Sequence, residues 1–155
     1  TLSETIPSRN TIDLSPPAVA GLRMTGRVVG ARWCPSPNFG KRPESAAISL
    51  LVVHNISLPP GQFGGDAIER FFCNQLSPSG IELEGADDIP YTAAQYEVLA
   101  DVSALIMKSW SAITPERITG HSDIAPGRKT DPGPAFDWPR YRQLLGTGHG
   151  NGADN

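Results

Sequence analysis

The stretch AISLLVVHN, residues Ala47–Asn55, decides the fold of this chain. Its run of β-branched and leucine side chains is continuous rather than alternating, which is the pattern of a strand covered on both faces. We therefore predict that it forms the central strand of a sheet. The strand ends at His54 and Asn55, where side chains at a sheet edge project into a crevice.

Helices and shorter strands are predicted around this central strand. The clearest helix begins at Thr92, which pairs with Gln95 in a capping box, and its apolar residues recur at spacings of three or four to about Trp110. The other expected elements are a short strand over Arg27–Ala31, a helix over Asp66–Leu76 capped by Asp66, strands over Ile81–Gly85 and Arg117–Gly120, and a helix over Trp138–Leu145 capped by Asp137. The pattern contains both helices and strands and has no internal repeat.

Length and composition exclude several classes of protein. The 155 residues correspond to about one domain, and 16 glycines and 15 prolines make the chain rich in loops, above all before the central strand. A formal charge of -3 excludes the basic surface of a nucleic-acid-binding protein. The longest apolar run, Ile48–Val53, is far shorter than the roughly 20 residues that cross a bilayer. We expect a soluble, intracellular monomer with no nucleic-acid or membrane partner.

The two cysteines, Cys34 and Cys73, cannot make a disulfide framework, and only one bridge between them is possible. Neither has a second cysteine or a histidine at short spacing. We interpret both as small, packed, free thiols in a reducing compartment.

Two of the three histidines occupy places where they could bind a metal. His54 ends the apolar strand, and His121 follows the short strand RITG and begins the loop HSDIAPGRKTD, which returns Asp131 near the same place. Two imidazoles, one carboxylate and a water would make a catalytic zinc site. The sequence has no HExxH pair, so a structural role for these histidines stays open at this point. His149 lies in the Gly-rich tail and is interpreted as a solvated residue.

Further candidates depend on whether a metal is present. Glu82 and Glu84 alternate on the expected strand IELEG, and one of them could face the same crevice as a general base. Lys129 lies two residues before Asp131, where an ammonium could stabilise a developing oxyanion. Without a metal, the simpler interpretation is that these side chains are solvated.

Three long strings resemble the AmpD-type N-acetylmuramoyl-L-alanine amidases. They are LLVVHNISLPPGQFGG from Leu50, IELEGADD with YTAAQY from Ile81, and TGHSDIAPGRKTDPGPAFDW from Thr119. ARWCPSPNFGKRP from Ala31 is similar to the approach to the first of them. Together these matches extend over about residues 31–145.

The resemblance implies a fold, an activity and a set of site residues. The fold would be α/β (α+β), with a mixed central sheet flanked by helices, as in peptidoglycan-recognition proteins. The activity would be cytoplasmic, zinc-dependent cleavage of the amide between N-acetylmuramic acid, especially its 1,6-anhydro form, and L-alanine in cell-wall recycling, which keeps β-lactamase expression uninduced. Position by position, the resemblance implies zinc ligands at His54, His121 and Asp131, a catalytic acid/base at Glu82, transition-state support from Lys129 and substrate contact by Asn55.

One departure from the family is large. Where the family continues for several dozen residues, Gly80 is followed directly by Ile81. Either the chain has an internal deletion, or a segment is left out of the sequence so that its two flanking residues stand next to each other. We expect a spatial break between Gly80 and Ile81. We accordingly divide the chain into an irregular N-terminal extension, 1–26, one amidase domain, 27–146, and a disordered tail, 147–155. The alternative function is a catalytically defective muropeptide-binding variant that lacks part of the substrate wall.

Overall fold

The computed structural model describes residues 12–55, 66–75 and 87–147, which form helices around one small sheet. The elements in chain order are α1 (Pro16–Thr25), β1 (Leu51–Val53), α2 (Ala67–Phe72), α3 (Ala93–Ser109), the 3₁₀ turn η2 (Pro115–Arg117), β2 (Ile118–Gly120), α4 (His121–Ile124) and α5 (Trp138–Thr147). The predicted α/β class is confirmed. The sheet of the described residues consists of one parallel pair.

The register of the two strands brings together their carboxyl ends. Leu51 pairs with Ile118, and Val53 pairs with Gly120. Because the strands are parallel, the residues that follow them leave the sheet at the same edge. The next residues are His54 on one strand and His121 on the other.

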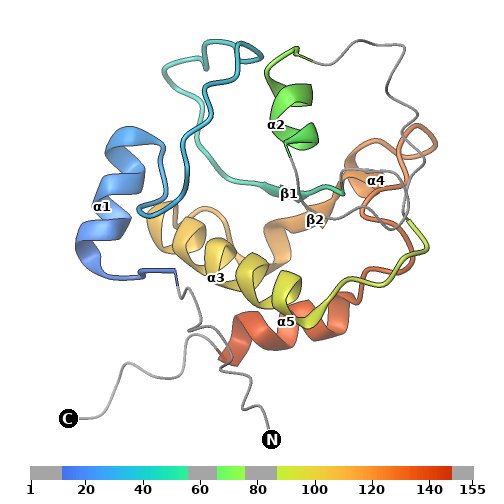
Figure 1. Ribbon diagram of the computed structural model, residues 1–155. Helices are drawn as coiled ribbons and strands as arrows, with labels where there is room; N and C mark the ends of the chain where they lie inside the picture. Colours follow the sequence, from blue (N-terminus) through green and yellow to red (C-terminus); the bar gives the residue numbers. More distant parts are fainter. Residues whose placement is uncertain (1–11, 56–65, 76–86, 148–155) are drawn as a thin grey trace, which may run out of the picture.

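The main core lies between the strand pair and helices α3 and α5, which lie below the strands in Figure 1, with α2 above them. Val53 and Ile118 supply the strand side of this core, and aromatic residues supply much of the helix side. The Tyr141 hydroxyl is fully buried and donates to Ser103 Oγ at 2.7 Å, so its polar atom is satisfied inside the core. This packing fixes the strands against α3 and α5.

Two helices predicted from capping signals, α3 and α5, are confirmed together with their caps. Thr92 and Gln95 form both hydrogen bonds of the capping box at the start of α3. At α5, Asp137 Oδ1 accepts from the backbone N–H of Arg140 at 2.9 Å. These local signals were reliable because each satisfies backbone donors that a helix start leaves unpaired.

The prediction that residues 1–26 are irregular is wrong for the part that forms α1. The Ser15 side chain accepts from the backbone of Ala18, and prolines occupy the first two helical positions, where a missing N–H costs nothing. Gly26, at φ 68°, ends the helix in the left-handed conformation. Leu22 is buried in a second cluster with Leu105 of α3. The prolines that indicated a loop are in fact a helix start.

Three further expectations were wrong in detail. Residues 27–31 form no strand, and Asp66 precedes α2 without a side-chain cap bond. The central strand is limited to residues 51–53 and is only partly covered, because β2 offers it three paired residues and Leu50 is 42% exposed. The expected strand over residues 81–85, the Gly80–Ile81 junction and the tail from residue 148 lie outside the described residues.

Candidate metal centre

His54 and His121 come together because they follow the paired ends of β1 and β2. Their ring centroids are 4.4 Å apart, with the rings at 60°. His121 is the first residue of α4, and the backbone N–H of Gly120 just before it donates to Asp123 Oδ2 at 2.9 Å. The sheet register thus predicts the histidine pair, and the start of α4 fixes the direction in which His121 leaves the strand.

Asp131 reaches the same point from the loop between α4 and α5. The backbone N–H of Ser122 donates to the carbonyl of Asp131 at 2.9 Å, which fastens this loop to α4. At Gly120 a Cβ would lie 2.7 Å from Pro132 Cδ, so the loop approaches the end of β2 too closely for a side chain there. The loop is therefore held against the strand ends by contacts that only a small residue permits.

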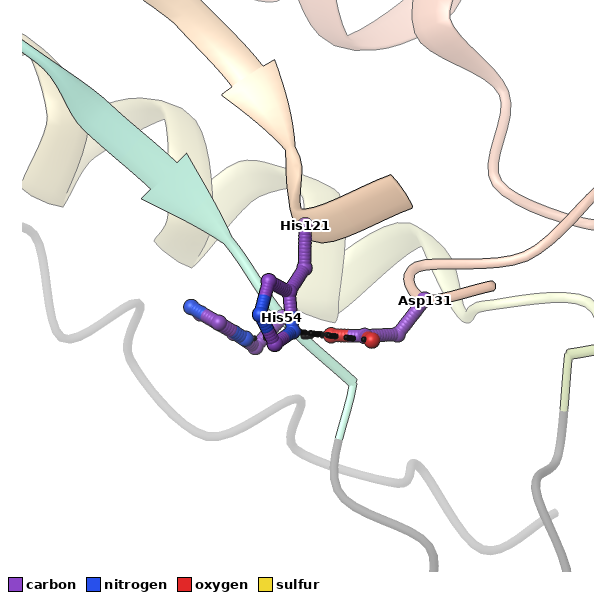
Figure 2. Close-up of side chains that lie close together, drawn as sticks. All are labelled: His54, His121 and Asp131. Carbon is purple, nitrogen blue, oxygen red and sulfur yellow. Dashed lines mark hydrogen bonds and ion pairs between the residues drawn. The ribbon is translucent and has the colours of Figure 1, made fainter. Parts of the chain in front are cut away.

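The three side chains converge on one another, as Figure 2 shows. His54 Nδ1 lies 3.0 Å from Asp131 Oδ2, and His121 Nδ1 lies 3.1 Å from Asp131 Oδ1. All three offer a ligand atom within 4.8 Å of the others. Ligand atoms at zinc–donor distances of about 2.0–2.2 Å in a tetrahedron lie about 3.3 Å apart. The donor set is therefore one that zinc accepts, and the two histidine–aspartate separations are close to this edge length.

Exposure differs among the three side chains and defines an open side of the cluster. His54 is 47% exposed, whereas His121 is 22% and Asp131 14% exposed. The less exposed His121 and Asp131 thus form the protein side of the cluster, and the cluster is open to solvent beside His54. A site that is anchored on one side and open on the other can admit a substrate and keep a position free for water.

Asp123 is close to the cluster in sequence, but its carboxylate forms hydrogen bonds within the turn instead of joining the cluster. Its carboxylate accepts from the Thr119 hydroxyl at 2.5 Å and from the backbone of Gly120. These hydrogen bonds, first that from Thr119, lower the pKa of Asp123 below its ordinary value. The residue stabilises the turn from β2 into α4 and leaves Asp131 as the carboxylate of the cluster.

Asn55, expected to contact substrate, is held by a residue that sequence reasoning did not identify. Its Nδ2 donates to Asp87 Oδ1 at 2.8 Å. Asp87 also accepts from the backbone N–H of Ala135 through its carbonyl, at 3.0 Å. Asp87 therefore connects the end of β1 to the loop that carries Asp131. A loop aspartate has no distinctive pattern in a sequence, so nothing short of the fold indicates this role.

Tyr91 adds a second support beneath the same loop. Its hydroxyl donates to the carbonyl of Pro132 at 2.9 Å. Burial is the main reason that the pKa of Tyr91 is raised above its ordinary value, so the hydroxyl keeps its proton for this bond. Asp87 and Tyr91 thus both hold the loop that carries Asp131.

The other predicted site residues, Lys129, Glu82 and Glu84, are not seen in contact with the cluster in the described structure. The side chain of Lys129 is exposed, and the described residues provide it with no hydrogen bond or ion pair to the cluster. Glu82 and the alternative Glu84 lie outside the described residues. The structure thus brings together His54, His121 and Asp131, with Asn55 adjoining, and leaves the proton-transfer residue a prediction.

Comparison with known proteins gives one consistent set of relatives. The model of a family described as N-acetylmuramoyl-L-alanine amidase matches residues 53–134. The chain is 39% identical to the 1,6-anhydro-N-acetylmuramyl-L-alanine amidase AmpD of Enterobacter cloacae, covering 79% of this chain and 94% of that protein. Its identity to the protein of the same name from Escherichia coli (strain K12) is 37%, covering 77% and 94%.

A solved structure supports the same comparison at the level of the fold. The crystal structure of a selenomethionine AmpD derivative matches with a TM-score of 0.69 and 33% identity, covering 77% of this chain and 97% of that one.

The alignment to the Escherichia coli protein spans 174 residues but takes in only 77% of this chain, about 119 residues. About 55 positions of the relative therefore have no counterpart here.

Proposed function

Because this chain belongs to the N-acetylmuramoyl-L-alanine amidase family, we propose that it hydrolyses the amide between 1,6-anhydro-N-acetylmuramic acid and L-alanine of muropeptides in peptidoglycan recycling. The observation that supports this most is the convergence of His54, His121 and Asp131 from three separate segments. All three lie within the residues that match the family. The enzyme is a hydrolase that acts on a linear amide.

The three side chains hold a zinc ion in this proposal. Two neutral imidazoles and one carboxylate are ordinary zinc ligands, and three protein ligands leave a position for water. A zinc ion held by these three residues would act as a Lewis acid and would lower the pKa of a bound water toward about 7. The open side beside His54, which is 47% exposed, is where the muropeptide amide approaches.

The chain's own residues then move protons and orient the substrate. Glu82 accepts a proton from the attacking water and delivers it to the amide nitrogen of the leaving L-alanine. The Lys129 ammonium stabilises the negative charge that develops on the carbonyl oxygen. Asn55, fixed by Asp87, contacts the substrate next to His54. We assign these roles from the family motifs in which the residues lie.

The setting of the proposed reaction is the cytoplasm, where muropeptides released from the cell wall are recycled. None of the helices in the described part of the chain is long and apolar enough to span a bilayer. The proposed partner is the muropeptide substrate, and we propose that the protein acts as a monomer.

A second candidate function follows from the shortened alignment. About 55 positions of the Escherichia coli relative have no counterpart in this chain. If those positions build the substrate wall, the chain binds muropeptide through the retained cluster without turning it over. This alternative predicts binding with no product.

The experiment that tests the proposal follows release of the L-alanyl peptide from a 1,6-anhydromuropeptide by mass spectrometry. The zinc-supplemented chain releases the peptide, a chelator stops release, and added zinc restores it. Glu82→Ala lowers the rate by about 10²- to 10⁴-fold and keeps its zinc, because a general base is not a ligand. Glu84→Ala is the matched control and keeps the wild-type rate.

Two results would overturn parts of the proposal. Loss of activity in Glu84→Ala with zinc retained would move the general base from Glu82 to Glu84. Muropeptide binding with no peptide released by the zinc-loaded wild-type chain would establish the binding variant in place of the amidase.

A further inference from the structure

Cys34 and Cys73 lie side by side, although 39 positions separate them in the sequence. Their Sγ atoms are 3.2 Å apart, and both are free thiols of intermediate exposure. Cys34 belongs to the irregular segment before β1, and Cys73 is the C-cap of α2. A disulfide has sulfurs about 2.05 Å apart, so this pair is within about 1 Å of covalent contact.

Hydrogen bonds hold the two backbones together around the thiols. The Ser36 hydroxyl and the Asn38 side-chain amide both donate to the carbonyl of Phe72, at 2.6 and 2.9 Å. The side-chain amides of Asn38 and Asn74 also bond each other in both directions, at 2.8 and 3.1 Å. Because these contacts already align the segments, closing the sulfurs requires little movement of the backbone.

The two thiols are not equivalent. The Cys73 thiol donates toward the carbonyl of Pro35 at 3.5 Å as well as lying against Cys34. Its hydrogen bond to Cys34 is the first cause, and burial the second, that raises the pKa of Cys73 above its ordinary value. The thiolate is the reacting form of a cysteine. The Cys73 thiol thus contacts both the sulfur of Cys34 and the backbone next to it, which holds the two thiols side by side.

We propose that Cys34 and Cys73 form a reversible disulfide that fastens the C-terminal end of α2 to residues 34–38. The oxidant is a small disulfide such as oxidised glutathione. The thiolate of one cysteine attacks one of its sulfurs and releases one glutathione thiolate. The other cysteine then loses its proton, attacks the cysteine sulfur that carries glutathione and displaces the second glutathione as its thiolate. The two cysteine sulfurs give up two electrons, and one glutathione disulfide becomes two thiols.

The proposed bond closes a loop that contains β1 and His54. Such a bond stabilises the folded chain by restricting the unfolded one, and the effect grows with the length of the loop. In a reducing compartment, a pair of this kind is transient and responds to oxidants instead of being a permanent staple. Neither thiol belongs to the histidine–aspartate cluster, so this inference is independent of the proposed amidase activity.

The test equilibrates the zinc-supplemented full chain in a glutathione redox buffer, traps free thiols by alkylation and maps the peptides. The expected product is a single intramolecular Cys34–Cys73 cross-link without retained glutathione. Its Tm is about 5–10 °C above that of the dithiothreitol-treated chain, and dithiothreitol reverses the shift. Cys34→Ser is the matched variant, which forms no internal cross-link and has the same Tm in both buffers.

A second measurement asks whether the fold itself brings the thiols together. The equilibrium constant for forming the bond is measured in the folded chain and in concentrated guanidinium chloride. We expect this equilibrium constant to be at least about tenfold larger in the folded chain. The free energy by which the bond stabilises the fold equals the free energy by which folding favours the bond, because the two equilibria are linked. Equal constants, glutathione retained on both cysteines, or cross-links between chains alone would overturn the proposal.

Discussion

Gly133 shows at the scale of one residue how tightly the Asp131 loop is built. It has φ 82°, and a Cβ at this position would lie 2.4 Å from the Cα of Asp87. Asp87 in turn holds Asn55 through its carboxylate. A side chain at position 133 therefore disturbs both the loop that carries Asp131 and the residue that positions Asn55.

The first prediction is that Gly133→Ala is strongly destabilising. A left-handed conformation costs an alanine about 1–2 kcal/mol, and the overlap with Asp87 adds a cost of about 1–3 kcal/mol. We expect the free energy of unfolding, measured with urea, to fall by about 2–5 kcal/mol and zinc to bind more weakly.

Gly146→Ala is the matched control for this substitution. Gly146 lies in α5, and a Cβ there would meet nothing within 4 Å. Alanine in a helix is favoured over glycine by about 0.5–1 kcal/mol, so this variant is as stable as the wild type or slightly more stable. Equal effects of the two substitutions would contradict the close approach at Gly133.

The cluster residues could be predicted from sequence, and their supports could not. His54 and His121 each follow an apolar stretch, so strand ends were the expected position for both. Asp131 was expected because a loop rich in proline and glycine returns to the same place. Asp87 and Tyr91, in contrast, act through contacts with residues about 30–40 positions away, which no local pattern encodes.

At the scale of one element, α3 is stabilised by its capping box. Thr92 accepts from the backbone N–H of Gln95, and the Gln95 side chain accepts from the backbone N–H of Thr92 at 2.8 Å. We predict that Thr92→Ala lowers stability by about 1 kcal/mol, which lowers Tm by about 2–4 °C in a chain of this length. Differential scanning calorimetry measures the shift.

Ser111→Ala provides the comparison for the cap. Ser111 is exposed in the turn after α3 and is no part of a helix cap. Removing its hydroxyl changes the stability by no more than about 0.5 kcal/mol, which keeps Tm within about 1–2 °C of the wild type. A Thr92→Ala shift no larger than that of Ser111→Ala would mean that the cap adds nothing to stability.

Helices and strands were predicted well where neighbouring residues in the sequence determine them. They were predicted poorly where contacts with distant segments determine them. The start of α3 was evident from Thr92 and Gln95, because a cap satisfies nearby donors. The helix α1 was missed because Pro16 and Pro17 were interpreted as loop residues, although both fit a first turn. Residues 27–31 have strand-like side chains but no partner strand in the described structure, and a strand needs one.

At the scale of the whole molecule, the parallel pairing of β1 and β2 creates the site. The two strands are far apart in sequence, yet their register places His54 next to His121. The helices α3 and α5 hold this pair from one side through the shared core. The fold class was expected from the resemblance to the amidase family, whereas the register depends on long-range packing that no single stretch of sequence contains.

The shortened alignment is the other feature of the whole chain. About 55 positions of the Escherichia coli relative are unmatched, and the sequence motifs locate the missing segment at Gly80–Ile81 as a prediction. The strands that carry the cluster are nevertheless paired, and their buried residues form one core. The chain thus retains the part of the fold that brings the three side chains together.

The most direct measurement of the central claim is the zinc content of the purified chain by elemental analysis after dialysis against trace zinc. The account predicts one zinc per wild-type chain, near-complete loss in His54→Ala, His121→Ala and Asp131→Ala, and full retention in His149→Ala, which removes the histidine outside residues 53–134. Absence of zinc from the wild-type chain, or full retention in Asp131→Ala, would contradict a zinc site built from these three residues.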